Sequence, residues 1–290
     1  MRRSATRPIR EPEEHLVTFA TIMVAVDFGE ATKARIGVAV ELASQFNALL
    51  IGVAGWPLCK ESTATSSAAT LPIGGHWDQD NVLVQLQRLG EKFRALASPA
   101  PRGVEWRSST GFPREVIANE ARAADLVVIG QDELPGDIGR TYDPGTIILT
   151  AGRPALVVPR AIRGLAASRV LIAWKDTREA RRAVRDALPF LKKAASVSIA
   201  LANPEKSTGS DARVADLVGY LARHDVKIEK QIATVADQEE GEILLQLAED
   251  NRIDLVVAGA YGRSRFSEWI FGGVTRHLLR NSTVPCLFSN

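Results

Sequence analysis

The chain has 290 residues, of which 46% are hydrophobic and 24% charged, and its formal net charge is +2. This composition is typical of a soluble globular protein with room for two domains of about 145 residues each. Because the charge is small and Arg and Lys are dispersed, nucleic-acid binding is not expected. No apolar run reaches the ~18 residues that span a bilayer, so no membrane association is expected. Cys59 and Cys286 have no metal-site spacing and favour a reduced, cytoplasmic setting.

Residues 1–17 begin with basic residues, lack the apolar segment of a secretory signal, and are expected to be a disordered tail. From residue 18 to 160, β-branched apolar runs alternate with segments of helical periodicity. The expected strands are residues 20–27, 48–55, 103–111, 125–130 and 155–159, and the expected helices include 31–46, a segment from Val82 to Phe93, and one that begins at Pro113. Strands this apolar are typical of a parallel sheet covered on both faces by helices.

The same order of elements occurs again from residue 168 to 290. The expected strands are residues 169–174, 196–203, 226–235, 254–259 and 283–288, and the expected helices are 177–193, 211–224 and 239–251. The sequence Asp-Leu-Val-Val begins at both residue 125 and residue 254, which are 129 residues apart. A repeat of that length indicates a duplicated domain. We therefore predict two tandem doubly wound, Rossmann-like domains, residues 18–160 and 168–290, each with its own parallel five-stranded sheet, joined by a linker at 160–168.

A glycine-rich stretch follows the apolar run 255–258. Gly259 and Gly262 are followed by a basic and aromatic segment and by Gly272 and Gly273, after which a helical spacing begins. Glycines let a backbone approach a ligand closely, and a helix N-terminus attracts anions. This arrangement predicts a phosphate-binding pocket. The alternative is that the glycines only shape a tight loop.

The spacing Gly259-x2-Gly262-x9-Gly272 resembles that of the universal stress protein family, whose ATP-binding members carry G-x2-G-x9-G-(Ser/Thr) after the fourth strand. The resemblance implies an adenine nucleotide alpha hydrolase-like fold and a stress-response function, with an adenine nucleotide, ATP being expected, at the carboxyl ends of the strands of the second domain. Gly273 stands where the family has Ser or Thr, and Thr275 matches a further hydroxyl position. The contacts implied for the nucleotide come from Gly259, Gly262, Arg263, Gly272, Gly273, Val274 and Thr275.

The two halves differ at the position where the family has an Asp at the end of the first strand. Asp27 matches it in the first half, but Glu133 replaces the middle glycine there, and further acidic residues (Asp132, Asp137 and Asp143) would repel a triphosphate. The first half is therefore not expected to bind ATP, and Asp27 would only cap the following helix. In the second half Lys175 takes the Asp position and Asp176 comes one residue later. Both are candidates for nucleotide contact, and a solvated Lys175–Asp176 pair is the alternative.

Two functions follow from this pattern. One is a stress-response protein that binds an adenine nucleotide in its second domain. The other is a scaffold without a nucleotide, which acts by self-association or by binding a partner. No Ser-His-Asp order, metal cluster or G-x-S-x-G elbow is present, so no catalytic residue is assigned and slow ATP hydrolysis is the most that is expected. The resemblance also implies that strands 155–159 and 283–288 pair as an internal pseudo-dimer, with a further homodimer compatible with the fold.

Overall fold

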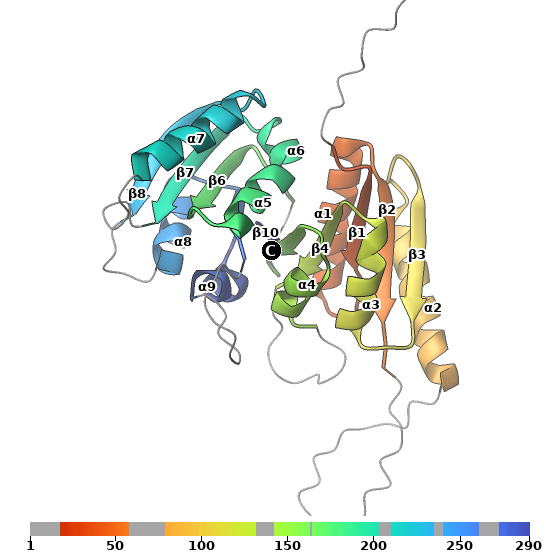
Figure 1. Ribbon diagram of the computed structural model, residues 1–290. Coiled ribbons are helices and arrows are strands. Elements are labelled where there is room, and N and C mark those ends of the chain that lie inside the picture. The colour runs from red at the N-terminus through yellow and green to blue at the C-terminus, as the bar shows by residue number, and fades with distance from the viewer. Residues whose placement is uncertain are drawn as a thin grey trace, which may run out of the picture.

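The computed structural model describes residues 18–57, 79–131, 142–162, 164–202, 210–234, 240–260 and 273–290. Figure 1 shows two lobes side by side, with the C-terminus between them. We call residues 18–160 the first half and residues 164–290 the second half. The predicted tail at residues 1–17 lies outside the described residues.

Strands and helices alternate through both halves, close to the ranges expected from the sequence. The first half contains β1 (Thr21–Ala25), α1 (Ala31–Phe46), β2 (Leu49–Gly55), α2 (Gln79–Ala97), β3 (Val104–Ser109), α3 (Pro113–Glu120), the 3-10 helix η1 (Ala121–Ala123), β4 (Leu126–Gly130), α4 (Pro144–Thr150) and β5 (Ala155–Val158). The second half contains β6 (Arg169–Trp174), α5 (Arg178–Asp186), α6 (Leu188–Leu191), β7 (Ser196–Ala202), α7 (Ser210–Ala222), β8 (Ile228–Thr234), α8 (Glu240–Asp250), β9 (Leu255–Gly259), α9 (Gly273–Asn281) and β10 (Cys286–Ser289).

The strands form one ten-stranded sheet in the order β3-β2-β1-β4-β5-β10-β9-β6-β7-β8. Within each half the described strands pair in parallel and in the same order, which supports the duplication. The final strands β5 and β10 pair antiparallel, with Cys286 opposite Val157. The predicted pairing of these two strands is confirmed. Each half contains the predicted five parallel strands, but the expectation that the two sheets are not continuous was wrong, because the β5–β10 pairing covers the edge of each and joins them.

The repeated Asp of the two Asp-Leu-Val-Val runs has the same structural role in both halves. Asp125 accepts hydrogen bonds from the backbone N–H groups of Ala20 and Thr21 at 2.9 and 3.0 Å. Asp254 accepts equivalent bonds from Ser168 and Arg169, both at 2.8 Å. Each carboxylate thus holds the start of the first strand of its half against the strand beside it, so the repeat of this Asp is explained by the fold rather than by a ligand.

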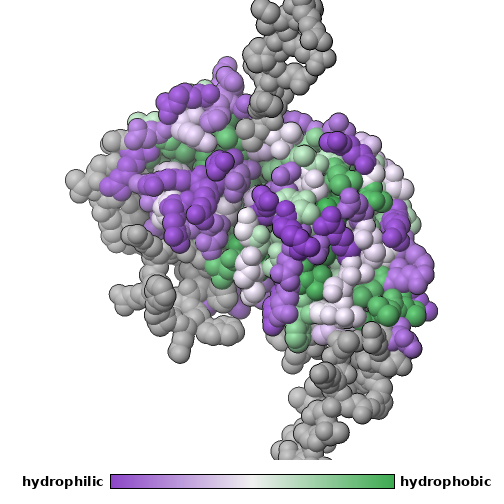
Figure 2. Space-filling view, turned by 45° about the vertical axis from the view of Figure 1, so that its right-hand side comes forward, coloured by the Kyte–Doolittle hydropathy of each residue, from purple (hydrophilic) through white to green (hydrophobic). Residues whose placement is uncertain are grey.

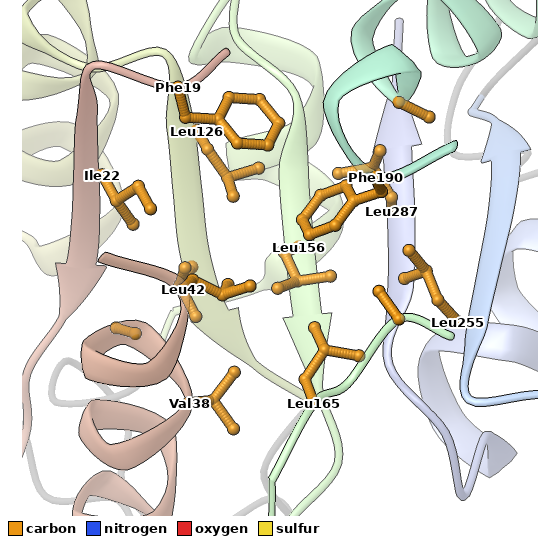
Figure 3. Packing of buried hydrophobic residues seen from close by; sticks show 14 of the residues in the cluster. Phe19, Ile22, Val38, Leu42, Leu126, Leu156, Leu165, Phe190, Leu255 and Leu287 are labelled. Atoms are coloured by element: carbon orange, nitrogen blue, oxygen red, sulfur yellow. The ribbon is translucent and has the colours of Figure 1, made fainter. Parts of the chain in front are cut away.

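Successive strand residues point to opposite faces of the sheet, so the apolar strands make both faces hydrophobic. Each face is covered by its own layer of helices. Helices α1, α2, α5, α6 and α7 cover one face, and α3, α4, α8 and α9 cover the other. Figure 3 shows that side chains from both halves meet in the first of these cores. There Phe190 lies 5.2 Å from Phe19 and 5.3 Å from Phe46, between ring centroids. The hydrophobic core is therefore continuous across the junction of the halves.

Two segments differ from the sequence-based expectation. The single helix predicted over residues 177–193 is divided into α5 and α6, and Pro189 lies in the first turn of α6, where its missing N–H costs no helical hydrogen bond. The predicted linker is not a loose connection. Leu165 is buried, and its backbone N–H donates to Glu41 Oε2 at 3.0 Å, which packs this segment against α1.

Candidate functional site

The predicted site of the second half lies where β6 and β9 end side by side at the carboxyl edge of the sheet. Gly259 is the last residue of β9. A Cβ at this position would collide with the backbone N of Ala180 and would lie 2.7 Å from the carbonyl carbon of Glu179. The first turn of α5 therefore rests directly on the strand end, and glycine is required there for packing as well as for any ligand.

Helix α9 begins at Gly273 and continues through Val274 and Thr275, and all three are residues that the sequence assigned to the nucleotide. A Cβ on Gly273 would meet nothing within 4 Å, whereas Thr275 is buried. The helix is held in place by close packing on α8, since a Cβ on Gly241 would lie 2.6 Å from the Cβ of His277. The other predicted contacts, Gly262, Arg263 and Gly272, lie outside the described residues.

Lys175 and Asp176 follow β6 directly but have different surroundings. Lys175 is exposed. The Asp176 carboxylate accepts hydrogen bonds from Arg181 Nε at 3.0 Å and Nη2 at 2.6 Å, and it lies 3.9 Å from Arg213 Nε. Asp176 is thus held by arginines of α5 and α7, in the helical layer that also contains α1 and α2.

Sequence reasoning missed Glu179, a carboxylate in the first turn of α5 that is only 1% exposed. Burial alone would raise the pKa of Glu179. Hydrogen bonds from the side chain of Arg178, from the backbone and from Thr177 outweigh burial and hold the pKa below the ordinary value. The signal available in the sequence was an acidic residue in a first helical turn, which is too common to single out.

The corresponding edge of the first half is occupied by Arg35, which is 2% exposed. Its guanidinium forms an ion pair with Asp27, donates from Nε to the carbonyl oxygen of Ala25 at 2.8 Å, and donates to Thr32 Oγ1 at 2.9 Å. A Cβ on Gly130, at the end of β4, would collide with Arg35 Nη1. The side chain of Arg35 therefore bridges the carboxyl ends of β1 and β4.

The expectation that Asp27 caps the following helix was wrong. The N-cap residue of α1 is Glu30, which makes no side-chain capping bond. Asp27 instead accepts from the backbone N–H of Gly29 at 2.9 Å and from the Thr32 hydroxyl, and it is the counter-ion of Arg35. Its role is to hold the turn after β1 and to neutralise a buried cation.

Helix α4, the counterpart of α9, is capped by its own carboxylate. Asp143 accepts hydrogen bonds from the N–H groups of Gly145 and Thr146, at 3.2 and 2.9 Å, and from the Thr146 hydroxyl at 2.7 Å. The two helices begin at Pro144 and Gly273, the same 129-residue offset as the Asp-Leu-Val-Val runs. The residue of the second half that corresponds to Asp143 is therefore Gly272. Asp132, Glu133 and Asp137 lie outside the described residues.

Neither a metal centre nor a membrane span is found in the described part of the chain. No group of three or more His, Cys, Asp or Glu side chains there could hold a metal ion. No helix among these residues is long and apolar enough to cross a membrane.

The strand order and the two helical layers define a doubly wound α/β protein with an internal repeat. The model of the universal stress protein family matches residues 18–138 and 166–289, and the chain belongs to this family. A curated relative, the universal stress protein Slr1230 of Synechocystis sp., is 24% identical over 192 residues, an alignment that spans 63% of this chain and 64% of that protein.

Solved structures show the same fold across nearly the whole chain. A universal stress protein from Archaeoglobus fulgidus matches with a TM-score of 0.69 and 14% identity, over 93% of this chain and 98% of its own. A functionally unknown protein from Pseudomonas aeruginosa, PA1789, matches with a TM-score of 0.56 and 14% identity, over 93% of this chain and 92% of its own. The arrangement of two repeats in one chain is thus shared with other proteins of this fold.

Proposed function

We propose that this protein is a stress-response protein that binds one adenine nucleotide, ATP being expected, at the carboxyl edge of its second half. Each half is proposed to be one domain, residues 18–160 and 168–290, and only the second is proposed to bind the nucleotide. The phosphates would lie over the N-terminus of α9, with Gly259, Gly262 and Gly272 allowing the backbone to approach them.

The observation that carries this proposal is the difference between the N-termini of α4 and α9. The N–H groups at the start of α4 are taken by the Asp143 carboxylate. At the corresponding position of α9 the chain has Gly272, which has no side chain to act as a cap. A phosphate is also an anion with acceptor oxygens, and it can take the place that Asp143 has in the first half.

The strand ends of the two halves are also covered by different groups. In the first half the guanidinium of Arg35 fills the space beside Gly130. Strands β1 and β6 correspond with an offset of 148 residues, which aligns Arg35 with Ala183. The second half therefore has no long side chain at this position, and the backbone of the first turn of α5 lies against Gly259 instead.

Calorimetric titration of the intact protein with ATP, ADP and AMP tests the proposal. We expect one nucleotide per chain. Gly272→Asp, which introduces the carboxylate that caps α4, should raise the dissociation constant at least about tenfold, because it competes with the phosphate for the same donors and repels it. Asp143→Gly is the matched control in the first half and should leave the affinity unchanged.

Two results would contradict the proposal. Two nucleotides per chain would mean that Arg35 and Asp143 do not close the first half. No affinity for any of the three nucleotides would favour the scaffold function instead. Gly130→Val is not a suitable control, because its side chain would displace the buried Arg35.

A further inference from the structure

Helices α1 and α5 follow equivalent strands but pack differently. Helix α1 packs against α2 and lies over β1, β2 and β4, whereas α5 lies over β9 and β10 as well as β6. The buried face of α5 carries Ala180 and Ala183, and these small side chains allow it to approach the sheet closely beside Gly259. A cavity of about 490 Å³ lies between α5 and α7.

The walls of this cavity, which we call the α5–α7 cavity, are apolar and aromatic. Trp174, the last residue of β6, and Val184 of α5 are buried and line it together with Leu217 and Tyr220 of α7. The ring of Tyr220 is supported by an edge contact with His224 at 4.7 Å between ring centroids. A planar apolar group is the kind of ligand that an indole, a phenol ring and two branched aliphatic side chains accommodate.

The rim of the cavity carries an excess of positive charge, since three arginines and two aspartates line it. Asp176 is already engaged by Arg181 and lies near Arg213. Arg185 is exposed on α5 and forms no salt bridge with any residue that the structure describes. In Figure 2 hydrophilic side chains cover most of the described surface of the second half, at the left, whereas hydrophobic patches interrupt the surface of the first half.

We propose that the α5–α7 cavity is a second ligand site, which binds a small organic anion with a planar apolar body, such as an aromatic carboxylate. The ring lies against Trp174 and Leu217, and the carboxylate is held by the guanidinium of Arg185. Arginine suits this role because its planar fork of donors matches a carboxylate. The volume is within the range of small-molecule sites, roughly 300–1,000 Å³.

Asp176 lines this cavity and is also a candidate for nucleotide contact, but the cavity is distinct from the N-terminus of α9, over which the phosphates are proposed to lie. The cavity lies in the helical layer of α1, α2, α5, α6 and α7, whereas α9 belongs to the opposite layer. In the described part of the first half the equivalent helices α1 and α2 pack on each other, and the strand residue aligned with Trp174 is Val26.

Calorimetric titration of the full chain with 2-naphthoate, and with its neutral analogue 2-naphthamide, tests the proposal. We expect one 2-naphthoate per chain and at least about tenfold weaker binding of the amide, the size of one charged hydrogen bond. Arg185→Glu should weaken 2-naphthoate binding by at least the same factor, about tenfold. Arg223→Glu, the same charge reversal at an exposed residue just beyond α7 that does not line the cavity, should leave it within about twofold.

A second measurement locates the ring. Binding of 2-naphthoate should change the intrinsic tryptophan fluorescence, and Trp174→Phe should remove that change. Saturating ATP should not displace 2-naphthoate, whether or not the second half binds ATP. The proposal is overturned if 2-naphthoate gives no saturable heat, if Arg185→Glu and Arg223→Glu weaken binding equally, or if ATP displaces the ligand.

Discussion

The two halves of this protein share one strand order and differ in what lies at the carboxyl edge of the sheet. In the first half the edge is closed by the chain itself, through the buried Arg35 and through Asp143 at the start of α4. In the second half the aligned residues are Ala183 and Gly272, which have little or no side chain. The duplicated halves thus keep the same strand order, while the groups that cover the carboxyl edge differ: side chains in the first half, and the backbone of the first turn of α5 beside Gly259 in the second.

The same comparison extends to the helical layer. Helix α1 is continuous over 16 residues and packs on α2, whereas the corresponding segment of the second half is divided into α5 and α6. Helix α5 ends before Pro189 and lies over β9 and β10. The α5–α7 cavity lies beside this helix.

The largest expected effect is on stability when the internal ion pair of the first half is broken. Arg35→Met keeps the length of the side chain but leaves the Asp27 carboxylate without its counter-ion. We expect a loss of about 3–5 kcal/mol in the free energy of unfolding, as for other buried ion pairs that lose one partner. Urea unfolding measures it, and Lys33→Met, at an exposed position of the same helix, is the control. A loss below about 1 kcal/mol would mean that Arg35 does not close this edge.

Removal of the cap of α4 should have a smaller effect. Asp143→Ala leaves the N–H groups of Gly145 and Thr146 without their acceptor, and the expected cost is about 0.5–2 kcal/mol by urea unfolding. Asp143→Asn should recover most of this loss, because Asn caps helices about as well as Asp. If Asn and Ala cost the same, the hydrogen bonds to these N–H groups are not what stabilises α4.

A pH-dependent difference is expected from Asp186 in α5. Burial raises the pKa of its carboxyl above the ordinary value of 3.8, although a hydrogen bond from Ser289 and nearby arginines oppose the shift. The folded protein therefore binds this proton more tightly than the unfolded chain does. This contribution to stability is complete below pH 3.8 and is lost as the pH rises through the folded-state pKa.

Asp186→Asn stays neutral at every pH. Its free energy of unfolding, relative to the native sequence, should therefore rise as the pH increases above 3.8. Urea unfolding at a series of pH values checks this. A relative stability that falls over the same range would show that the ionised carboxylate is the favoured form.

The smallest effect is expected where the halves meet. Cys286 faces Val157 across the β5–β10 pair, and these two residues are also equivalent in the repeat. Burial raises the pKa of the Cys286 thiol to about 12, so it stays protonated and acts as a small core residue. Cys286→Val makes the two strands alike at this pair and should change the free energy of unfolding by less than about 1.5 kcal/mol. A larger loss would indicate that its contact with Ser282 stabilises the junction.

Much of the fold follows from local patterns in the sequence. The apolar runs and the helical spacing predicted every strand of the sheet, and α1 begins and ends at the predicted residues 31 and 46. The 129-residue repeat predicted the duplication, and the glycine spacing predicted the family. These features could be predicted because hydrophobic periodicity and glycine spacing are local patterns, which can be recognised within short stretches of the sequence.

Other features were decided only by the tertiary structure, because they depend on partners far away in the sequence. By residue type Arg35 would be expected on the surface. It is buried because Asp27, Thr32 and the carbonyl of Ala25 come together around it. The fusion of the two sheets depends on the pairing of β5 with β10, about 130 residues later, and the α5–α7 cavity is formed jointly by residues of β6, α5 and α7. Local periodicity determines which face of an element is apolar, but the partner that covers that face is chosen by packing of the whole chain.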